Sequence, residues 1–406
     1  MAQGPDAGST RSWWLLNMPS EPAYVTSPPS VADIVVIGAG MTGVSVGYWL
    51  KRLYGRSCIL FDARGIAGGA TGRNGGHLWP RPGSDFEAGV TSDLLQYISE
   101  QRLSCDLSSH LGSIAVDSSI GVQFEDTYVD PEDVAEKLQN WEGECVRQYG
   151  EDECRQALNT DAFDSGLFYP NAMQFNPAKV TQSLFEASGA IACCPVLVRS
   201  LEHVADGRVL IKTDGGDVSA AIVVIATNAW AGQLLPELIP YLTPTRNHVM
   251  MTAPLPGAHS WTVGGLSSGD ASKEIYCILR SDGRLCIGGA RALEDDALGS
   301  TDDSSLSHVC SSALKSFLRE AFPALGFKDD LVESEWTGVL ALSKDGCPLC
   351  GPLPKHPNVY VAAGFSGHGM PQCFGVGKGI AQWIVEGEDA LHPFLQGPAN
   401  VRRFLS

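Results

Sequence analysis

Residues 34–63 constrain the fold more than any other part of the sequence. A hydrophobic run enters a glycine-rich turn, a helix-forming segment follows, and a second hydrophobic run ends on Asp62. Gly38, Gly40 and Gly43 have the spacing G-x-G-x-x-G, in which the glycines permit the tight turn, the approach of a pyrophosphate and the packing of the helix on the sheet. Helix amides can bind phosphate, and an acid about 20 residues later can accept ribose hydroxyls. The pattern predicts a βαβ unit that binds a dinucleotide.

The charge favours a small-molecule partner. The 406 residues include 28 basic and 46 acidic side chains, for a net charge of −18, which is unfavourable for binding nucleic acid or an anionic membrane surface. No apolar run approaches the roughly 20 residues of a membrane span. The N-terminus lacks the pattern of a signal peptide, and the C-terminal "FLS" is not the peroxisomal signal. We expect a cytoplasmic protein.

The 12 cysteines are expected to be reduced and mostly buried. Neither the adjacent Cys193 and Cys194 nor the motif "CPLC" at 347–350 has the second ligand pair that a zinc site usually requires. We therefore expect no metal.

Three segments predict two kinds of sheet. The apolar runs "AAIVVIATNAW" (220–230) and "NVYVAAGFSGHGM" (358–370) are typical of strands in a parallel sheet covered on both faces. The segment "EIYCILRSDGRLCIGGA" (274–290) predicts a β-hairpin that turns at Asp282 and Gly283, which suits an antiparallel sheet.

Residues 131–158 predict a helix, with Asp130 as its cap and Pro131 in its first turn.

Together the elements predict an α/β fold: a Rossmann-type nucleotide-binding domain with a parallel sheet, and a smaller α+β substrate domain with an antiparallel sheet. In the N-terminal tail, the apolar "WWLL" (13–16) could pin the segment to the body of the protein. The expected boundaries are 1–30 for that tail, 31–110, 171–240 and 331–395 for the discontinuous nucleotide-binding domain, 111–170 and 241–330 for the substrate domain, and 396–406 for a C-terminal tail.

The loop after Asp62 decides between NAD and FAD. "RGIAGGATGRNGGHL" (64–78) contains six glycines, whose entropic cost is explained if backbone lies against a ligand. The loop resembles that of the D-amino-acid-oxidase-like family of FAD-dependent oxidoreductases, and is most similar to γ-glutamylputrescine oxidase-like and fungal amine-oxidase-like members with a "GA-T/S-GRNGG" loop. "IVVIATNAW", the hairpin, "DGCPLCGPLP" and "VYVAAGFSGHGM" resemble the same family. The resemblance implies about one FAD per chain, bound by the Rossmann-type domain.

The motifs also predict the residues that contact FAD. The turn "GFSGHGMPQ" (364–372) opens a helix with Pro371 in its first turn, so its amides could stabilise the negative charge of a reduced flavin. His368 could add a hydrogen bond there or be purely structural. The predicted cofactor-binding residues are Gly38, Gly40, Met41, Thr42, Gly43, Asp62, Ala63, Arg64, Ala70, Thr71, Gly72, Arg73, Asn74, Gly75, Gly76, His77, Gly364, Gly367, His368, Gly369 and Met370.

Two positions bear on covalent attachment of FAD. Family members with a tether use a histidine near the N-terminal loop or a cysteine before the C-terminal segment. His77 offers a histidine, though not clearly in the register of the known tether. Alignment with the sarcosine-oxidase-like pattern places Gly338 where the linking cysteine would stand. We expect non-covalent FAD, with a His77 tether or an active-site role for His77 as the alternative.

The predicted catalytic residues are Tyr276, Arg280, His77 and His368. Tyr276 and Arg280 share one face of the hairpin by strand period. Arg280 could hold a substrate carboxylate in a bidentate contact, or be a solvated strand arginine. Arg246 and His248, on another expected strand, compete for the same role.

Departures from the family pattern bear on the substrate and the acceptor. The arginine of the "Y-x-R" start corresponds to Ile278. The carboxylate-binding lysine that follows "GHGF" in sarcosine-oxidase-like members corresponds to Pro371, and the lysine used toward oxygen falls near Cys286. These differences argue against a simple N-methylamino-acid substrate and weaken the case for a fast reaction with oxygen.

The resemblance implies oxidation of a C–N bond. A neutral amine or amino-acid-like substrate would transfer its α-hydrogen as hydride to flavin N5 and form an imine, with O2 as the expected acceptor; such catalysis needs positioning more than a strong base. One alternative is a flavin dehydrogenase or tailoring enzyme of specialised metabolism acting on a complex alkaloid-like substrate. Another is a non-catalytic dinucleotide-binding sensor. The sequence leaves the substrate, the acceptor and the oligomeric state open.

Overall fold

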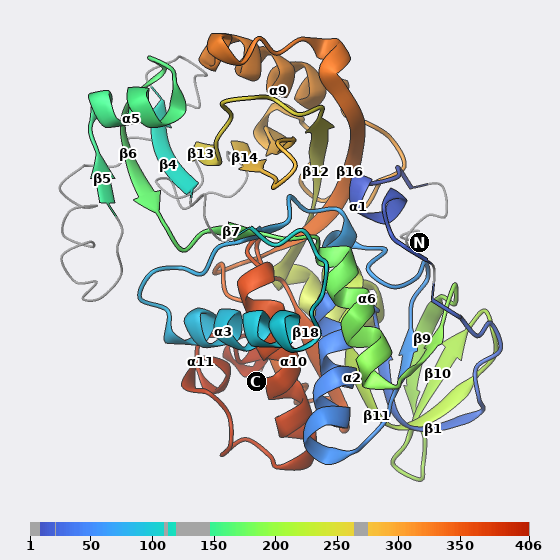
Figure 1. Ribbon diagram of the computed structural model, residues 1–406. Coiled ribbons are helices and arrows are strands. Elements are labelled where there is room, and N and C mark those ends of the chain that lie inside the picture. Colours follow the sequence, from blue (N-terminus) through green and yellow to red (C-terminus); the bar gives the residue numbers. More distant parts are fainter. Residues whose placement is uncertain (1–8, 21, 109–112, 119–146, 264–274, 406) are drawn as a thin grey trace.

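Two large sheets organise the chain (Figure 1). The computed structural model describes residues 9–20, 22–108, 113–118, 147–263 and 275–405. One eight-stranded sheet, in the lower half of Figure 1, is mainly parallel; the other, in the upper half, is mainly antiparallel. The predicted α/β fold with these two kinds of sheet is confirmed.

The central strands of the first sheet are apolar, and side chains on both of their faces belong to buried clusters, as is typical of a parallel sheet covered on both sides. Its parallel strands lie in the order β18, β11, β1, β2, β8, with β17 antiparallel at one edge and the β9–β10 ribbon attached to β11. The strands are β1 (Val31–Ile37), β2 (Ile59–Phe61), β8 (Ile191–Cys193), β9 (Val198–His203), β10 (Val209–Thr213), β11 (Val218–Ile225), β17 (Leu349–Pro352) and β18 (Val359–Ala363).

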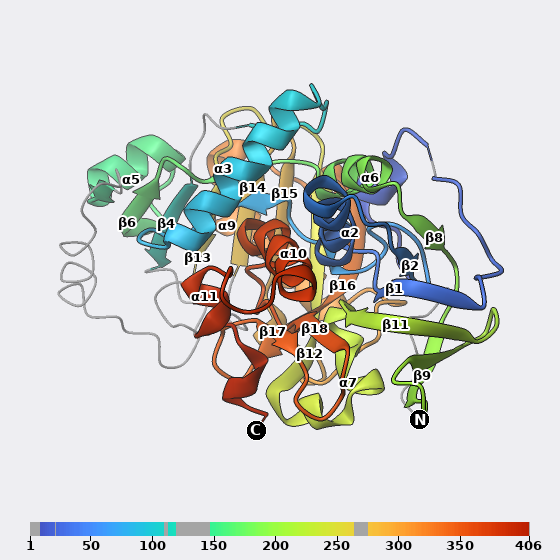
Figure 2. The ribbon, with the colours of Figure 1, turned by 90° about the horizontal axis from the view of Figure 1, so that it is seen from below.

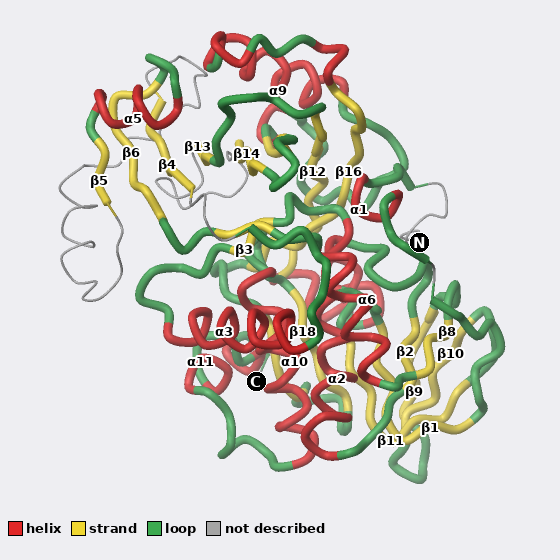
Figure 3. The backbone as a smooth tube through the Cα atoms, viewed as in Figure 1, coloured by secondary structure: helices red, strands yellow, loops and turns green. Residues whose placement is uncertain are grey.

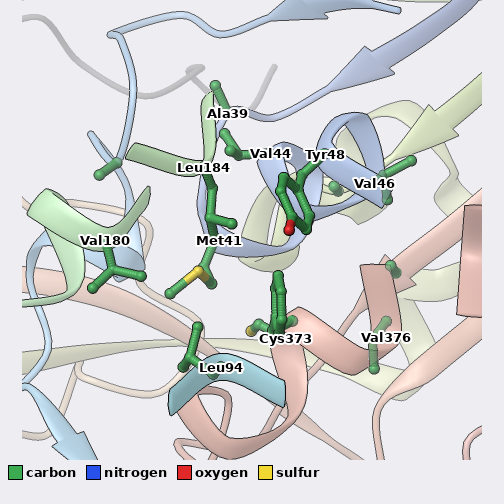
Figure 4. Close-up of a cluster of buried hydrophobic side chains, with 14 of the residues drawn as sticks. Ala39, Met41, Val44, Val46, Tyr48, Leu94, Val180, Leu184, Cys373 and Val376 are labelled. Carbon is green, nitrogen blue, oxygen red and sulfur yellow. The ribbon is translucent and has the colours of Figure 1, made fainter. Parts of the chain in front are cut away.

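Four helices pack together on one side of this sheet (Figure 2). They are α2 (Met41–Tyr54), α3 (Asp85–Glu100), α6 (Pro177–Ser188) and α10 (Met370–Val385). Figure 4 shows Met41 of α2 lying among Leu94 of α3, Leu184 of α6 and Cys373 of α10. Glycine permits the closest approach, since a Cβ at Gly377 would lie 2.4 Å from the Cβ of Ser45. The packing fixes the start of α2, and therefore the glycine turn before it.

The second sheet runs in the order β16, β12, β15, β14, β13, β4, β6, β5. Helix α9 (His308–Ala321) covers it with Leu314, Phe317 and Leu318, and α5 (Glu151–Leu158) lies near its far edge. Its strands are β4 (Ser113–Ser118), β5 (Arg147–Tyr149), β6 (Phe163–Tyr169), β12 (Leu242–Thr252), β13 (Trp261–Val263), β14 (Ile275–Leu279), β15 (Leu285–Gly289) and β16 (Val332–Ser343).

Short elements join the two sheets (Figure 3). A two-stranded ribbon pairs β3 (His77–Leu78) with β7 (Met173–Gln174). The remaining helices are α1 (Trp13–Leu16), α7 (Ala231–Leu234) and α11 (Pro393–Gln396). Strand β16 pairs with β12 in the antiparallel sheet, although its residues fall in the range 331–395 expected for the cofactor domain. The domain boundaries remain a prediction.

The predicted hairpin is confirmed: β14 and β15 are antiparallel, and Gly283 in the turn has a φ of +83°. The continuous helix predicted for 131–158 is wrong in its second half, and residues 131–146 lie outside the described part. Arg147–Tyr149 forms strand β5, because pairing with β6 and the stacking of Tyr149 on Phe168 override local helix propensity. The helix begins only after Gly150.

The cysteines in the described part of the chain are free thiols, and all of them except Cys347 are buried. Within the same residues, no helix combines the length and the apolar character needed to cross a membrane.

Candidate cofactor and substrate site

A cavity lies where the carboxyl ends of the parallel strands face the antiparallel sheet. Its wall includes Ile37 at the end of β1, Phe61 at the end of β2 and Ala226 just after β11. On the opposite side it includes Asn247 of β12 and Tyr276 of β14. Open α/β sheets bind ligands at this edge, and the antiparallel sheet closes it from above.

The glycine turn has the geometry that its spacing predicted. Gly38 has a φ of +107°, and a Cβ there would lie 2.4 Å from the Ala226 carbonyl oxygen. A Cβ at Gly43 would lie 1.9 Å from the Gly38 carbonyl oxygen, so this residue serves helix packing and does not line the cavity. Gly40 faces the cavity with only the Thr71 side chain near its Cβ position. The start of α2 is therefore accessible to a phosphate.

Asp62 lines the cavity and also orders the loop that follows it. One carboxylate oxygen accepts hydrogen bonds from the amides of Arg64, at 2.8 Å, and Gly65, at 3.0 Å; the other accepts the Ala39 amide at 2.9 Å. The carboxylate therefore joins the glycine turn to the glycine-rich loop. Contact of Asp62 with a ribose stays a prediction.

The glycine-rich loop is attached to the substrate side by a buried ion cluster. Arg64 makes a bidentate contact with Asp303, with both N–O distances 2.8 Å. Arg73 lies 3.7 Å from the same carboxylate and donates to the Thr337 carbonyl at 2.7 Å. Burial lowers the pKa of Arg73 to about 10, with the Arg64 charge adding to this and Asp303 opposing it. The aspartate holds two loop arginines in place.

The predicted C-terminal turn is also in the wall, backed by a carboxylate that the sequence analysis missed. His368 Nε2 lies 2.9 Å from Glu87 of α3, which also accepts hydrogen bonds from the Gln372 side chain at 2.7 Å and the Arg81 amide at 2.6 Å. Burial would raise the pKa of Glu87, but the hydrogen bond and charge of His368, with the other two donors, lower it. An ionised Glu87 thus fixes the His368 ring at the cavity wall.

His77, on β3, lines the cavity beside Trp79, with ring centroids 5.1 Å apart. Burial, and then the charge of His368, lower the pKa of His77 to about 3. The imidazole is therefore neutral at physiological pH, and can offer one donor and one acceptor but no charge.

Arg291 is a functional candidate that the sequence analysis missed. It is 3% exposed, stands two residues after the end of β15 and lines the cavity. Its Nη1 donates to the Asn247 side chain at 2.6 Å, and the Asn247 amide donates to the Tyr276 hydroxyl at 3.2 Å. These three residues form the polar end of the cavity on the substrate side. The signal available in the sequence was an arginine two residues after a strand that ends in Gly-Gly.

Arg280 does not line the cavity, contrary to the prediction. Strand β14 ends at Leu279, so Arg280 belongs to the turn. Its guanidinium lies 3.5 Å from Asp106, 3.4 Å from Asp282 and 4.9 Å from the ring centre of Trp14. These contacts hold it behind the cavity wall.

The competing candidates, Arg246 and His248, also lie outside the cavity. Asn247 stands between them on β12 and faces the cavity, so strand alternation directs both of its neighbours to the other face. Arg246 pairs with Glu294 at 2.6 Å, and His248 Nε2 lies 2.9 Å from Glu335.

The His248 cluster predicts a pH dependence of stability. Burial would raise the pKa of Glu335, but hydrogen bonds from His248 and Lys315 lower it to about 2, from 4.5. A depressed carboxyl pKa contributes stability that is complete above the unfolded value and is lost as the pH falls toward the folded value. We expect Glu335→Gln to lower the free energy of unfolding by on the order of 3 kcal/mol at pH 7, and by less as the pH falls below 4.5. Urea unfolding across this range measures it; Glu333→Gln, on the more exposed carboxyl of the same strand, is the control and should show a much smaller pH-dependent change.

Most predicted site residues meet in this one cavity. Those that line it are Gly38, Gly40, Met41, Thr42, Asp62, Ala63, Arg64, Ala70, Thr71, Arg73, Asn74, Gly75, His77, Tyr276, Gly367, His368, Gly369 and Met370. Gly43, Gly72, Gly76, Gly364 and Arg280 do not. The four glycines instead pack closely behind the wall, where an added Cβ would lie within 2.6 Å of a neighbouring atom.

The residues present fit a flavin dinucleotide. Thr227 Oγ1 and Trp230 Nε1 are buried atoms of the cavity-lining residues and have no hydrogen-bond partner in the described part of the chain. Buried polar atoms are normally paired, so these two indicate a ligand. Both stand in the quoted segment "IVVIATNAW", but neither was among the predicted contacts. Gly40 leaves the phosphate position open, and the turn before α10 supplies amides at the other end.

Comparison with known proteins agrees with this reading. The chain is 25% identical over 377 residues to the probable oxidoreductase OrdL of Rhizobium meliloti. The alignment covers 88% of this chain and 84% of that protein. It is 24% identical to gamma-glutamylputrescine oxidoreductase of Escherichia coli, over 87% of this chain and 83% of that one. The fold is similar to the crystal structure of glycine oxidase from Geobacillus kaustophilus, with a TM-score of 0.74, 19% identity and coverage of 93% and 100% of the two chains. The model of the DAO family, described as FAD dependent oxidoreductase, matches residues 33–383. The chain therefore belongs to the DAO family and is an FAD-dependent oxidoreductase.

Proposed function

We propose that this enzyme oxidises a C–N bond of an amine or amino-acid-like substrate that also carries an anionic group, giving an imine. The observation that carries the proposal is the buried guanidinium of Arg291 in the cavity wall, linked through Asn247 to Tyr276. A guanidinium binds a carboxylate or similar anion through paired hydrogen bonds, which fixes the orientation of a substrate. The names of relatives that act on glutamylputrescine and glycine support the substrate class.

Each residue at the substrate end has a proposed role. Arg291 binds the anionic group, Asn247 orients the guanidinium, and the Tyr276 hydroxyl donates to or accepts from the substrate. His77 is neutral at physiological pH, so it can exchange a hydrogen bond with the substrate amine without adding a charge of its own. Bound FAD would supply the acceptor for the two electrons and the α-hydrogen. Catalysis then depends on holding the α-carbon in line with the flavin.

A substrate panel tests this function. We expect an amine bearing a carboxylate to bleach the flavin absorbance under anaerobic conditions, and the same compound without its anionic group to do so much more slowly. Hydrogen peroxide formed in air then distinguishes an oxidase from the dehydrogenase alternative. If no amine reduces the flavin while a substrate oxidised at carbon–carbon bonds does, the proposal is wrong.

We expect acid precipitation to release the flavin into the supernatant, at about one FAD per chain. Gly338, the position that aligns with the linking cysteine of the sarcosine-oxidase-like pattern, lines the cavity, and a Cβ there would lie only 2.8 Å from the Cβ of Arg73. The packing therefore disfavours a side chain at this position. A yellow pellet would instead indicate a tether, for which His77 is the candidate, and His77→Ala would then release the flavin.

A further inference from the structure

An N-terminal segment outside the family match lies against the cofactor loop. Residues 9–16 precede the matched range 33–383. Ser9 Oγ accepts a hydrogen bond from Arg73 at 2.8 Å, Ser12 Oγ donates to the Gly72 carbonyl, and Trp14 Nε1 donates to the Asn74 carbonyl at 2.6 Å. The three contacts fall on consecutive residues of the glycine-rich loop. Arg73 and Asn74 also line the cavity, so the segment supports the wall directly from behind.

The packing between the segment and the loop is close. Trp14 is fully buried, and a Cβ at Gly76 would lie 3.0 Å from its ring. A Cβ at Gly72 would lie 3.0 Å from Leu15. Gly72 and Gly76 do not line the cavity; they allow this contact, together with closer approaches to the carbonyl oxygens of Ala67 and Phe175.

The same segment reaches the substrate side. Thr10 accepts a hydrogen bond from the Thr337 amide of β16 at 2.9 Å, and its own amide donates to the Asp303 carbonyl at 2.8 Å. Arg280, in the turn of the hairpin that carries Tyr276, lies over the Trp14 ring. Figure 1 shows α1 lying beside β16 and above α6.

We propose that Ser12 and Trp14 are positioning residues for FAD, and that docking of residues 9–16 and binding of FAD are coupled. A loop with six glycines has a large conformational entropy and needs restraint to present one backbone surface to a ligand. The docked segment supplies that restraint, so FAD binds more tightly when it is docked. By thermodynamic reciprocity, bound FAD must favour docking by the same factor.

The first test is the affinity of the full-length apoprotein for FAD. We expect Trp14→Ala to raise the Kd of FAD about tenfold or more, within the usual range of coupling between sites. Trp14→Phe keeps most of the packing but loses the bond to Asn74, and Ser12→Ala loses the bond to Gly72; each should have a smaller effect of the same sign. Leu16→Ala is the matched control, because this side chain of the same helix is 53% exposed, and its Kd should equal that of the parent.

The second test separates coupling from a general loss of structure. Arg11 is exposed and precedes buried Ser12, so trypsin can cut this bond only when the segment leaves its site. We expect cleavage at Arg11 to be at least several-fold faster in the apoprotein than with saturating FAD.

Equal cleavage rates with and without FAD would overturn the coupling. An unchanged FAD Kd in a folded Trp14→Phe and Ser12→Ala double variant would overturn the positioning role. Neither result depends on which substrate the enzyme oxidises.

Discussion

Replacing Arg291 with alanine is expected to lower kcat/KM by at least about thirtyfold on any substrate that carries the anionic group. The guanidinium is buried at the polar end of the cavity, so its loss leaves the substrate anion desolvated and unpaired. Removing one partner of a buried hydrogen-bonded charge pair costs roughly 2 to 5 kcal/mol. Steady-state kinetics and anaerobic flavin reduction measure the effect. A substrate analogue without the anionic group should react equally with the parent and with Arg291→Ala.

Two variants sharpen the test. Arg291→Lys should recover only part of the loss, because an ammonium group cannot reproduce the planar pair of donors that also orients Asn247. Arg284→Ala is the control on the same hairpin: this arginine pairs with Asp282 and Glu333 outside the cavity, and its loss should leave kcat/KM close to that of the parent. An unchanged kcat/KM in Arg291→Ala would move the anion site elsewhere in the cavity.

The nucleotide end of the site could be predicted from the sequence because its geometry is local. The turn at Gly38 requires a positive φ and no side chain, and Gly43 requires contact with a carbonyl only five residues earlier. Such constraints fix the spacing of the glycines along the chain, and this spacing is visible in the sequence itself. Asp62 likewise ends a strand and bonds to amides that are near it in the chain. The hairpin was predicted for the same reason, since the alternation of side chains along its strands and its Asp-Gly turn are both local features of the sequence.

Apart from Tyr276, the substrate end could not be predicted, because it depends on where each strand ends and which of its faces points into the cavity. Tyr276 lies within β14 and lines the cavity. Because β14 ends at Leu279, Arg280 falls in the turn and leaves the face that Tyr276 shares with the cavity. The alternation on β12 selects Asn247 and excludes both flanking residues. Glu87 is 281 residues from His368, and no sequence pattern relates the two. Likewise β5 exists only through its pairing with β6.

Asp303→Asn is expected to cause the largest loss of stability among these variants. Asp303 is 1% exposed and contacts Arg64 through both carboxylate oxygens, with Arg73 beside it. Asparagine preserves the shape but removes the only negative charge described between two largely buried guanidinium groups. Breaking a buried ion pair by removing one partner costs about 3 to 5 kcal/mol. Urea unfolding of the apoprotein should show a decrease of that order in the free energy of unfolding.

The neighbouring Asp302 provides the control for this prediction. Its carboxylate is half exposed and lies 3.4 Å from Arg246, so Asp302→Asn should change the free energy of unfolding by less than about 1 kcal/mol. Since Arg64 and Arg73 also line the cavity, Asp303→Asn should bind FAD more weakly as well, and excess FAD should restore part of the lost stability by mass action. If Asp303→Asn unfolds like the parent, the two arginines must obtain their compensation from the backbone carbonyls of Gly68 and Thr337. The loop would then be held by hydrogen bonds to the chain rather than by the charge of Asp303.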